Sequence, residues 1–383
     1  MDLEQLFDLN KEQSLRGRYI TLDAIGPLLN KLNTNNQLEI IGKSVLEKPI
    51  YKYQIGTGKI KILLWSQMHG NESTTTKALF DFLNVLQTNS EFANTLLKAF
   101  TFCCIPMLNP DGAKLYTREN ANKVDLNRDS QELSQPESRV LRATFENFKP
   151  DICYNLHDQR TIFGVESTGK PATVSFLAPA YNESREINES RLKAINLIAG
   201  MNDVLQHYIP GQVGRFDDSF NINCVGDTFQ SLGVPTVLFE AGHFPNDYLR
   251  EETRKHIFIA LVSSFEILNE NDIVVSKYDK YLSIPQNKVV FYDFLYKNIK
   301  INYDGIEIMT NFAAQYKEEL VKNQIIFNAY IVKIGELEDY FGHYEYDGNR
   351  ALYHDKNCDY PKLDQKSDFY LDNNLKFVNG LLV

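Results

Sequence analysis

The segment from residue 60 to residue 87 constrains the fold of this chain more than any other. It begins with an apolar run at 60–65, typical of a buried strand, and ends with apolar side chains at helical spacing over residues 73–87. The turn between them contains His69 and Glu72. A strand that passes directly into a helix is typical of open α/β sheets, which bind ligands at the carboxyl ends of their strands. His69 and Glu72 therefore lie where such a fold places its site.

The pair formed by His69 and Glu72 indicates a metal site, but the spacing has a second interpretation. An imidazole and a carboxylate at this spacing can point at one metal ion, and this combination of ligands suits zinc. The same spacing also occurs by chance, and the alternative is a helix-capping glutamate beside an unrelated histidine. The pair alone does not decide between the two.

The region up to about residue 270 alternates between predicted strands and predicted helices. Apolar runs predict strands at 38–42, 50–55, 60–65, 100–105, 151–156, 174–177 and 235–239. Helical periodicity predicts helices at 73–87, 134–148, 184–208 and 247–268. Residues 1–36 are expected to be a helical lead-in that closes with a turn at 33–36. The alternation favours an α/β fold whose mostly parallel sheet is covered by helices on both faces, with some antiparallel pairs.

Two further turns are predicted from composition. Gly56–Lys59 predicts a hairpin-like turn that leads into the strand at 60–65. Asn109–Gly112 predicts another turn, directly after the strand at 100–105.

The composition changes near residue 276. Most of the chain's 21 tyrosines lie beyond this point, and segments with helical periodicity become scarce. Short strands are predicted at 289–294, 299–303, 306–309, 325–332 and 340–346. We therefore expect a large α/β domain, residues 1–275, and a small β-rich domain, residues 276–383.

Charge and composition narrow the class of partner. The chain has 383 residues, a formal net charge of −10, and 43% hydrophobic and 23% charged residues, which is ordinary for a globular protein. Such an acidic chain is not expected to bind nucleic acid or an anionic membrane, and no segment approaches the ~20 apolar residues of a membrane span. The N-terminus lacks the features of a signal peptide, and the five cysteines show no CxxC spacing. We expect a reduced, cytoplasmic protein.

Three predicted strands end in a residue that can bind zinc or act beside it. These residues are His69, His157 and Glu240, and Glu72 follows the first of them. A catalytic zinc site has three protein ligands and keeps a position open. A carboxylate that is not a ligand can take a proton from water and pass it to a leaving amine. The shared position at strand ends therefore indicates a zinc-dependent hydrolase.

These residues lie in motifs that resemble those of the M14 zinc carboxypeptidase family. HxxE alone is unspecific, but the whole series occurs in the family's order over roughly residues 40–265 and is highly specific. The resemblance implies a mixed sheet of about eight strands between helices, and hydrolysis of an amide bond next to a free carboxylate. The motifs are HGNE at 69–72, NPDG at 109–112, Arg118, VDLNR at 124–128, the strand-end histidine at 157 and the strand-end glutamate at 240.

The resemblance implies the roles at the metal. His69, Glu72 and His157 correspond to the ligands of a single zinc ion. Glu240 corresponds to the general base and proton shuttle.

The resemblance also implies the residues that bind substrate. Asn127 and Arg128 correspond to the clamp for the substrate's terminal carboxylate, a group that the planar fork of arginine meets with two hydrogen bonds. Arg118 corresponds to the residue that polarises the scissile carbonyl and stabilises the developing oxyanion. The alternative for Arg118 and Arg128 is a pair of loop salt bridges on an acidic protein.

The sequence departs from the digestive members of the family in two places. Those enzymes carry a tyrosine, shortly before the catalytic glutamate, that folds over bound substrate, but no tyrosine lies between Tyr208 and Glu240 here. Charged residues at 215–218 occupy this region, either as contacts to a polar substrate or as a solvated loop. Asp158 and Arg160 also follow the strand-end histidine; Asp158 could orient a zinc ligand, and Arg160 could bind substrate charge.

Three functions remain open from the sequence. The leading one is a zinc metallocarboxypeptidase that releases the C-terminal residue of a peptide. The second is an amidohydrolase that cleaves an N-acyl amino acid, because deacylases of the succinylglutamate desuccinylase and aspartoacylase type also carry a β domain after the catalytic one. The third is an inactive protein that binds carboxylates or acts as a scaffold, which the presence of all three ligands and the base disfavours.

Overall fold

The structure, a computed structural model, describes residues 2–33, 37–270, 277–356, 358–372 and 374–383. Internal contacts divide the chain into two compact units. The first contains Met1–Gln159 and Ala172–Asn287, and the second contains Arg160–Pro171 and Lys288–Val383. The expected domain boundary after residue 275 lies outside the described residues, as do residues 34–36 of the turn expected at 33–36.

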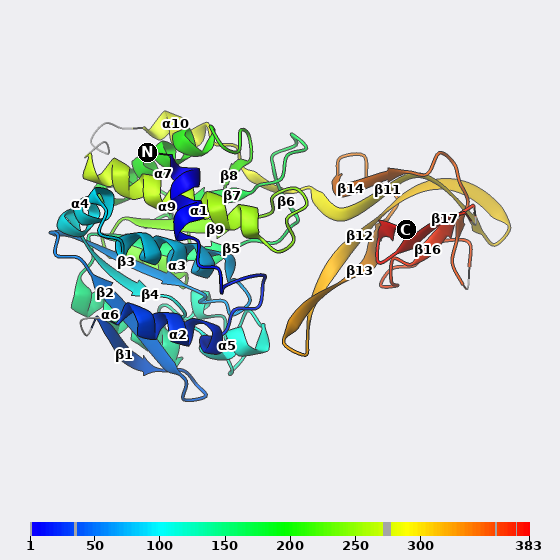
Figure 1. Cartoon of the computed structure of the whole chain (residues 1–383). Coiled ribbons are helices and arrows are strands. Elements are labelled where there is room, and N and C mark those ends of the chain that lie inside the picture. Colours follow the sequence, from blue (N-terminus) through cyan, green and yellow to red (C-terminus); the bar gives the residue numbers. More distant parts are fainter. Residues whose placement is uncertain (1, 34–36, 271–276, 357, 373) are drawn as a thin grey trace. The chain divides into compact units, whose positions relative to one another are not determined.

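The first unit is built on a mixed sheet of eight strands, which confirms the predicted fold class (Figure 1). Parallel pairing joins β4, β3, β5 and β9 in that spatial order, and antiparallel pairs lie toward both edges. In the order of the sheet, the strands are β1 (Leu38–Lys43), β2 (Pro49–Ile55), β4 (Phe100–Ile105), β3 (Ile60–Ser66), β5 (Ile152–Asp158), β9 (Thr236–Ala241), β7 (Val174–Leu177) and β8 (Val213–Arg215).

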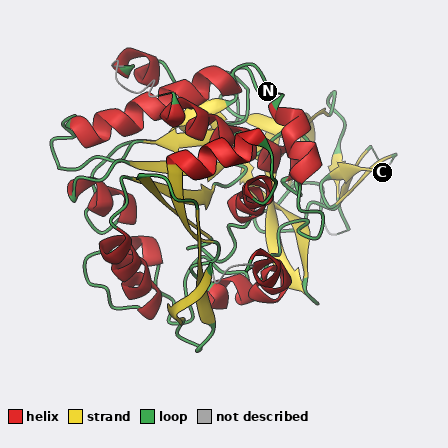
Figure 2. Ribbon diagram, turned by 60° about the vertical axis from the view of Figure 1, so that its left-hand side comes forward, coloured by secondary structure: helices red, strands yellow, loops and turns green. Residues whose placement is uncertain are grey.

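Helices cover both faces of this sheet (Figures 1 and 2). Helices α1, α3, α4, α7 and α9 pack on one face, and α6 and α8 pack on the other. Among the described residues, no helix combines the length and the apolar character needed to cross a membrane. The helices of this unit are α1 (Leu3–Asn10), α2 (Leu22–Leu32), α3 (Thr74–Leu86), α4 (Glu91–Ala99), α5 (Pro110–Leu115), the 3₁₀ helix η1 (Leu126–Arg128), α6 (Pro136–Phe148), α7 (Glu189–Leu205), α8 (Val225–Ser231), α9 (Glu251–Asn269) and α10 (Tyr278–Leu282).

Strand β3 shows why its sequence reads as one continuous apolar run. Successive side chains of a strand point to opposite faces of the sheet. Ile62 and Leu64 enter the core beneath α3 and α9, while Leu63 and Trp65 enter the core beneath α6 and α8. Because both faces of β3 are covered, polar residues can appear only where the strand ends.

The turn at Gly56–Lys59 does not form the expected hairpin. Strand β2 pairs with β4, and β4 lies between β2 and β3. The turn instead crosses the start of β4, where the N–H groups of Thr57 and Gly58 donate to the carbonyl oxygens of Leu97 and Phe100. A Cβ atom on Gly58 would lie 1.9 Å from the backbone of Ala99, so glycine permits this close crossing.

The second unit is β-rich, and its strands are longer than expected. The strands predicted at 289–294 and 299–303 form one strand, β11, because a bulge after Tyr296 interrupts the pattern without ending the strand. Its sheet runs in the order β13 (Gln324–Ile334), β12 (Ile306–Val321), β11 (Phe291–Tyr303) and β14 (Phe341–Asp347). A smaller sheet contains β15 (Tyr353–His354), β16 (Phe369–Leu371), β17 (Leu375–Val378) and β18 (Leu381–Leu382), and β10 (Asn287–Val289) pairs with β6 (Phe163–Val165).

The segment 160–171 belongs to the second unit, although it lies between β5 and β7 in the sequence. The Thr161 hydroxyl accepts a 2.8 Å hydrogen bond from the side-chain amide of Gln315, and Nε2 of His343 lies 2.8 Å from the carbonyl oxygen of Thr161. The chain therefore passes between the two units three times, at 159/160, 171/172 and 287/288.

A fully buried ion pair connects α3 and α9. Nε and Nη2 of Arg254 lie 2.6 and 2.5 Å from the carboxylate of Asp81, and both side chains are 0% exposed. Arg254 also donates to the carbonyl oxygens of Leu15 and Glu12, which attaches the N-terminal segment to the same point.

Asp81→Ala should strongly destabilise the first unit, because it removes the buried carboxylate that binds Arg254 and leaves this charge only the partly exposed Glu251 as an ion-pair partner. We expect the free energy of unfolding to fall by about 3–5 kcal/mol. Urea unfolding followed through the fluorescence of Trp65, the chain's single, buried tryptophan, measures this loss. The control is Asp23→Ala at the exposed pair with Lys114, where at most about 1 kcal/mol should be lost. Equal losses in the two variants would contradict the prediction.

Candidate metal centre and active site

The turn that carries His69 and Glu72 leaves the sheet through an unusual backbone conformation. Gln67 follows the last residue of β3 and has a φ of 48°, in the left-handed region. Its side-chain amide donates to the carbonyl oxygens of Ile20 and Gly70, at 2.8 and 2.9 Å. These bonds hold the turn in a conformation that an unsupported side chain rarely adopts.

The segment Asn109–Gly112, predicted as a turn, is instead the start of helix α5. Asn109 caps this helix by accepting a 2.8 Å hydrogen bond from the N–H of Gly112. Its Nδ2 also donates to the carbonyl oxygen of Met68 at 3.1 Å. A Cβ atom on Gly70 would lie 1.9 Å from the backbone of Gly112, so the two segments touch directly. The NPDG motif therefore supports the turn that bears the first two predicted ligands.

The structure brings the three predicted zinc ligands together. Ligand atoms of His69, Glu72 and His157 lie within 4.8 Å of one another. Nδ1 of His69 is 2.8 Å from Oε1 of Glu72, and Nδ1 of His157 is 2.9 Å from Oε2 of the same carboxylate. Two imidazoles and one carboxylate are the donor set of a catalytic zinc site with three protein ligands. The residues fit this metal.

The pKa values around Glu72 suit a metal centre. Burial would raise the pKa of Glu72, but His69 and His157 hold it well below its usual range, so the carboxylate is ionised. Burial lowers the pKa of His157, which keeps this imidazole neutral. Burial also acts to lower the pKa of His69, but the charge of Glu72 outweighs it and the pKa of His69 is raised. A cation at this point would therefore displace a proton from His69.

Asp125 completes the support of His69, and the sequence singled it out only as part of the VDLNR motif. Its Oδ1 lies 2.9 Å from Nε2 of His69. A carboxylate at this nitrogen favours a proton there, which leaves Nδ1 as the nitrogen that would bind a metal ion between Glu72 and His157. The pKa of Asp125 is lowered: burial opposes its charge, but the bond to His69 and the charge of Arg118 favour it.

Glu240 lies beside the metal ligands on the neighbouring strand. In the register of β5 and β9, Glu240 is paired with His157, so both side chains emerge on the same face. Glu240 is half-buried as a residue, while its Oε2 atom is buried and has no hydrogen-bond partner among the described residues. Burial, together with the charges of Glu72 and Asp158, raises the pKa of Glu240 well above its usual value.

Arg118 reaches the edge of the ligand set. Its Nη1 lies 3.1 Å from Oε1 of Glu72, and its Nε lies 3.1 Å from Oδ2 of Asp125. The side chain is 42% exposed, so it is accessible beside the ligands. Its contacts are salt bridges, as in the alternative interpretation, and its role toward a carbonyl remains a prediction.

The predicted carboxylate clamp is fastened to the start of helix α8. Oδ1 of Asn127 accepts a 3.0 Å hydrogen bond from the N–H of Val225. Nη1 of Arg128 donates to Sγ of Cys224 at 3.2 Å and to the carbonyl oxygen of Asn127 at 2.8 Å. Neither Cys224 nor Val225 is marked by any sequence signal. The structure therefore fixes the orientation of Asn127 and Arg128, while their role in binding substrate remains a prediction.

The charged loop that replaces the family's tyrosine is held by internal contacts. Asp218 forms a 2.5 Å ion pair with Arg191, whose side chain is buried, and a 3.4 Å pair with Arg185. Nε of Arg215 donates to the carbonyl oxygen of Ile284. Asp218 and Arg215 thus already form ion pairs or hydrogen bonds within the first unit.

Asp158 and Arg160, which follow His157, lie in different units of the chain. The carboxylate of Asp158 accepts hydrogen bonds from backbone N–H groups of α3, and its own N–H donates to Oε2 of Glu72 at 3.1 Å. Its role in orienting a zinc ligand stays a prediction. Arg160 belongs to the second unit.

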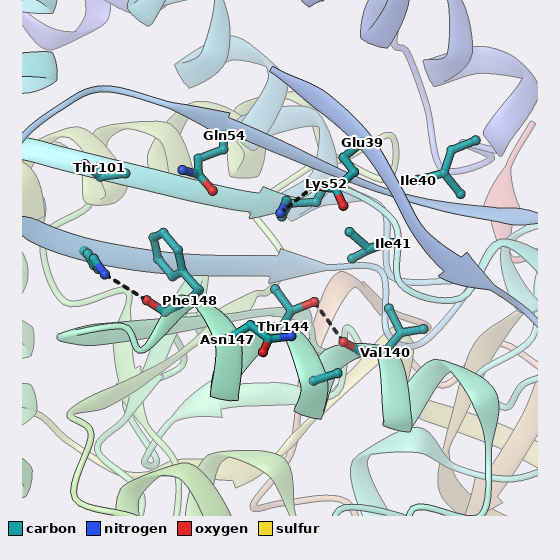
Figure 3. A pocket seen from close by; sticks show the side chains of 12 residues that line it. Glu39, Ile40, Ile41, Lys52, Gln54, Thr101, Val140, Thr144, Asn147 and Phe148 are labelled. Atoms are coloured by element: carbon teal, nitrogen blue, oxygen red, sulfur yellow. Dashed lines mark hydrogen bonds and ion pairs between the residues drawn. The ribbon is translucent and has the colours of Figure 1, made fainter. Parts of the chain in front are cut away.

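A separate cavity of about 470 Å³ lies between β1, β2 and α6 (Figure 3). Nζ of Lys52 lies 2.8 Å from Oε2 of Glu39 beside this cavity. Figure 3 shows this pair and Phe148 among the side chains that line it. None of the predicted site residues lines this cavity. It is therefore distinct from the candidate active site.

Part of the chain is similar to known carboxypeptidases. Residues 28–188 match the family model for zinc carboxypeptidase. Carboxypeptidase 2 of Trichophyton tonsurans is 30% identical over 116 residues, which are 30% of this chain and 20% of that protein. Carboxypeptidase SOL1 of Arabidopsis thaliana is 28% identical over 141 residues, which are 32% of this chain and 29% of that protein. The matches thus span less than a third of these curated relatives.

Solved structures show the same fold. A metallo-carboxypeptidase from Burkholderia cenocepacia is 16% identical, with a TM-score of 0.51 over 65% of this chain and 69% of that one. A metallo-carboxypeptidase from Pseudomonas aeruginosa, solved with (2-guanidinoethylmercapto)succinic acid, is also 16% identical, with a TM-score of 0.52 over 66% and 69% of the two chains.

The first unit therefore has the fold of the metallo-carboxypeptidases. The predicted resemblance to the M14 zinc carboxypeptidase family is confirmed, and residues 28–188 are the part of the chain that the family model matches. The cofactor of this family is zinc, and His69, Glu72 and His157 fit it.

Removal of one ligand should abolish stoichiometric zinc binding. Loss of a residue that only hydrogen-bonds a metal ligand weakens metal binding by roughly 10–100-fold. We expect His157→Gln, which removes a ligand itself, to weaken zinc binding by more than this. Metal analysis after dialysis against a chelator, followed by zinc titration, measures the change. His207→Gln, at an exposed histidine of the first unit, is the control and should bind zinc normally. Unchanged stoichiometry in His157→Gln would overturn the ligand assignment.

Proposed function

We propose that this protein is a zinc-dependent carboxypeptidase that hydrolyses the last peptide bond of a peptide with a free C-terminal carboxylate. The observation that carries the proposal is the convergence of His69, Glu72 and His157 beside Glu240 on the neighbouring strand. The match to the zinc carboxypeptidase family supports it.

Glu240 is the group that moves protons in this proposal. Zinc, when bound, supplies a Lewis acid that acidifies water and polarises a carbonyl. Glu240 lies outside the ligand set, so its carboxylate is available to take a proton from the attacking water. Oε2 of Glu240 is buried and has no hydrogen-bond partner among the described residues, so it is available to hold this proton until it is delivered to the leaving amine.

Asn127 and Arg128 select the end of the peptide. Because Oδ1 of Asn127 accepts the N–H of Val225, its Nδ2 is the group that remains to donate to a carboxylate. The guanidinium of Arg128 offers paired donors to a carboxylate. A substrate held by its terminal carboxylate presents only its last amide bond to Glu240, which accounts for release of a single residue.

Arg118 is proposed to stabilise the negative charge that develops on the scissile carbonyl oxygen. It lies next to Glu72 and remains accessible. A single donor in such a position is worth about 3–4 kcal/mol of transition-state stabilisation.

Glu240→Gln should retain zinc but lose turnover. The substitution keeps the shape of the side chain and removes the base, so kcat should fall by roughly 10²–10⁴. A panel of peptides and a panel of N-acyl amino acids, both assayed with the zinc-loaded protein, measure the activity, and metal analysis measures the zinc. A near-normal kcat in this variant would exclude Glu240 as the base.

The same panels separate the proposal from its alternatives. Hydrolysis of N-acyl amino acids without hydrolysis of any peptide would contradict the carboxypeptidase and indicate a deacylase. A zinc-loaded protein without activity on either panel would indicate a carboxylate-binding protein.

Arg128→Lys should impair recognition of the terminal carboxylate. Loss of a charge-assisted hydrogen bond costs about 1.5–3 kcal/mol, so kcat/KM for a free peptide should fall roughly 10–100-fold, mainly through KM. The C-terminally amidated form of the same peptide should be a poor substrate for both proteins. Arg139→Lys, at an exposed arginine of α6, is the control. Equal losses on the free and amidated peptides would contradict the clamp.

A further inference from the structure

Helix α3 receives its N-terminal cap from a distant strand. The helix begins at Thr74, directly after the turn with Glu72, and the side chain of its N-cap residue, Ser73, makes no capping bond. The carboxylate of Asp158 caps it instead, accepting the N–H of Thr74 at 2.8 Å and the N–H of Thr75 at 3.2 Å. Asp158 is the last residue of β5.

Asp158 joins the two segments that carry the metal ligands. It directly follows His157, and it binds the helix that directly follows Glu72. Its own backbone N–H donates to Oε2 of Glu72 at 3.1 Å. Side chain and backbone of one residue therefore fasten β5 to the turn that carries His69 and Glu72.

Helix α3 is capped by Asp158 although Ser73, at its own N-cap position, could have served as a local cap. Serine is among the best N-cap residues, but the hydroxyl of Ser73 donates to the carbonyl oxygen of Arg18. The carboxylate of Asp158 is buried, at 7% exposure for the residue, and the helix N-terminus offsets the cost of burying its charge. A cap from β5 achieves what a local cap cannot, since it also sets the spacing between β5 and α3.

We propose that Asp158 is a positioning residue that preorganises the metal site by holding His157 at the correct distance from His69 and Glu72. The inference rests on the proposed function only in taking these three residues as the zinc ligands. Asp158 touches neither the substrate nor the metal in this role. It acts through the backbone of α3 and the turn before it.

Zinc affinity and the visible spectrum of the cobalt-substituted protein test the inference. In Asp158→Ala, competition with a chelator should show zinc binding weakened by roughly 10–100-fold, the usual effect of losing a residue that orients ligands. The cobalt spectrum should change in shape, because it reports the coordination geometry. Asp158→Asn retains one acceptor for the N–H groups of α3 and should be intermediate, and it provides the measurement if the alanine variant does not fold.

The matched control is Asp247→Ala. Asp247 caps α9 in the same manner, accepting the N–H groups of Glu251, Glu252 and Thr253 at 2.8–2.9 Å, and it is not next to a ligand. The control should lose stability but bind zinc with normal affinity.

Two results would overturn the inference. One is normal zinc affinity in Asp158→Ala, with only the loss of stability that the control shows. The other is weaker binding with an unchanged cobalt spectrum, which would assign the effect to the lost charge. Neither result depends on peptide hydrolysis. If the proposed function is wrong, the wild-type protein will bind zinc without hydrolysing peptides, and this outcome is separate from both results.

Discussion

The site depends on the carboxylate of Glu72. Its oxygens lie 2.8 and 2.9 Å from ring nitrogens of His69 and His157, and 3.1 Å from both the guanidinium of Arg118 and the backbone N–H of Asp158. Burying a charge is costly unless donors surround it, and here the donors come from three separate segments of the chain, at His69, at Arg118 and at residues 157–158. The requirement to satisfy this one carboxylate therefore draws β3, β5 and the loop after α5 to a single point.

The residues that carry the chemistry at this point could be predicted from sequence, while the hydrogen bonds that hold them in place could not. Buried strands hide their polar residues until they end, so His69, His157 and Glu240 stand out at the ends of apolar runs. Asp125 and Asp158 bind partners 56 and 84 residues away in the chain. The local pattern of a sequence does not show which distant residue a side chain will bind. Such long-range hydrogen bonds form only when the strands and helices pack together.

In the fold, too, some features could be predicted from sequence and others could not. Periodicity predicted most strands of the first unit and its longer helices α3, α6, α7 and α9, and the mixed sheet of eight strands is confirmed. The order of the strands in the sheet could not be predicted. β4 lies between β2 and β3, because packing, and not adjacency in the chain, determines which strands pair. In the second unit the bulge in β11 made one strand look like two.

The three passages of the chain between the two units limit how this architecture can be divided. Segment 160–171 starts two residues after Asp158, yet it pairs with residues beyond 287. A truncation after Asn287 would thus leave an orphaned loop attached to β5, with its own polar and apolar contacts stripped away. The C-terminal region cannot be treated as a detachable appendage, and a minimal catalytic fragment would have to replace the loop as well as omit the tail.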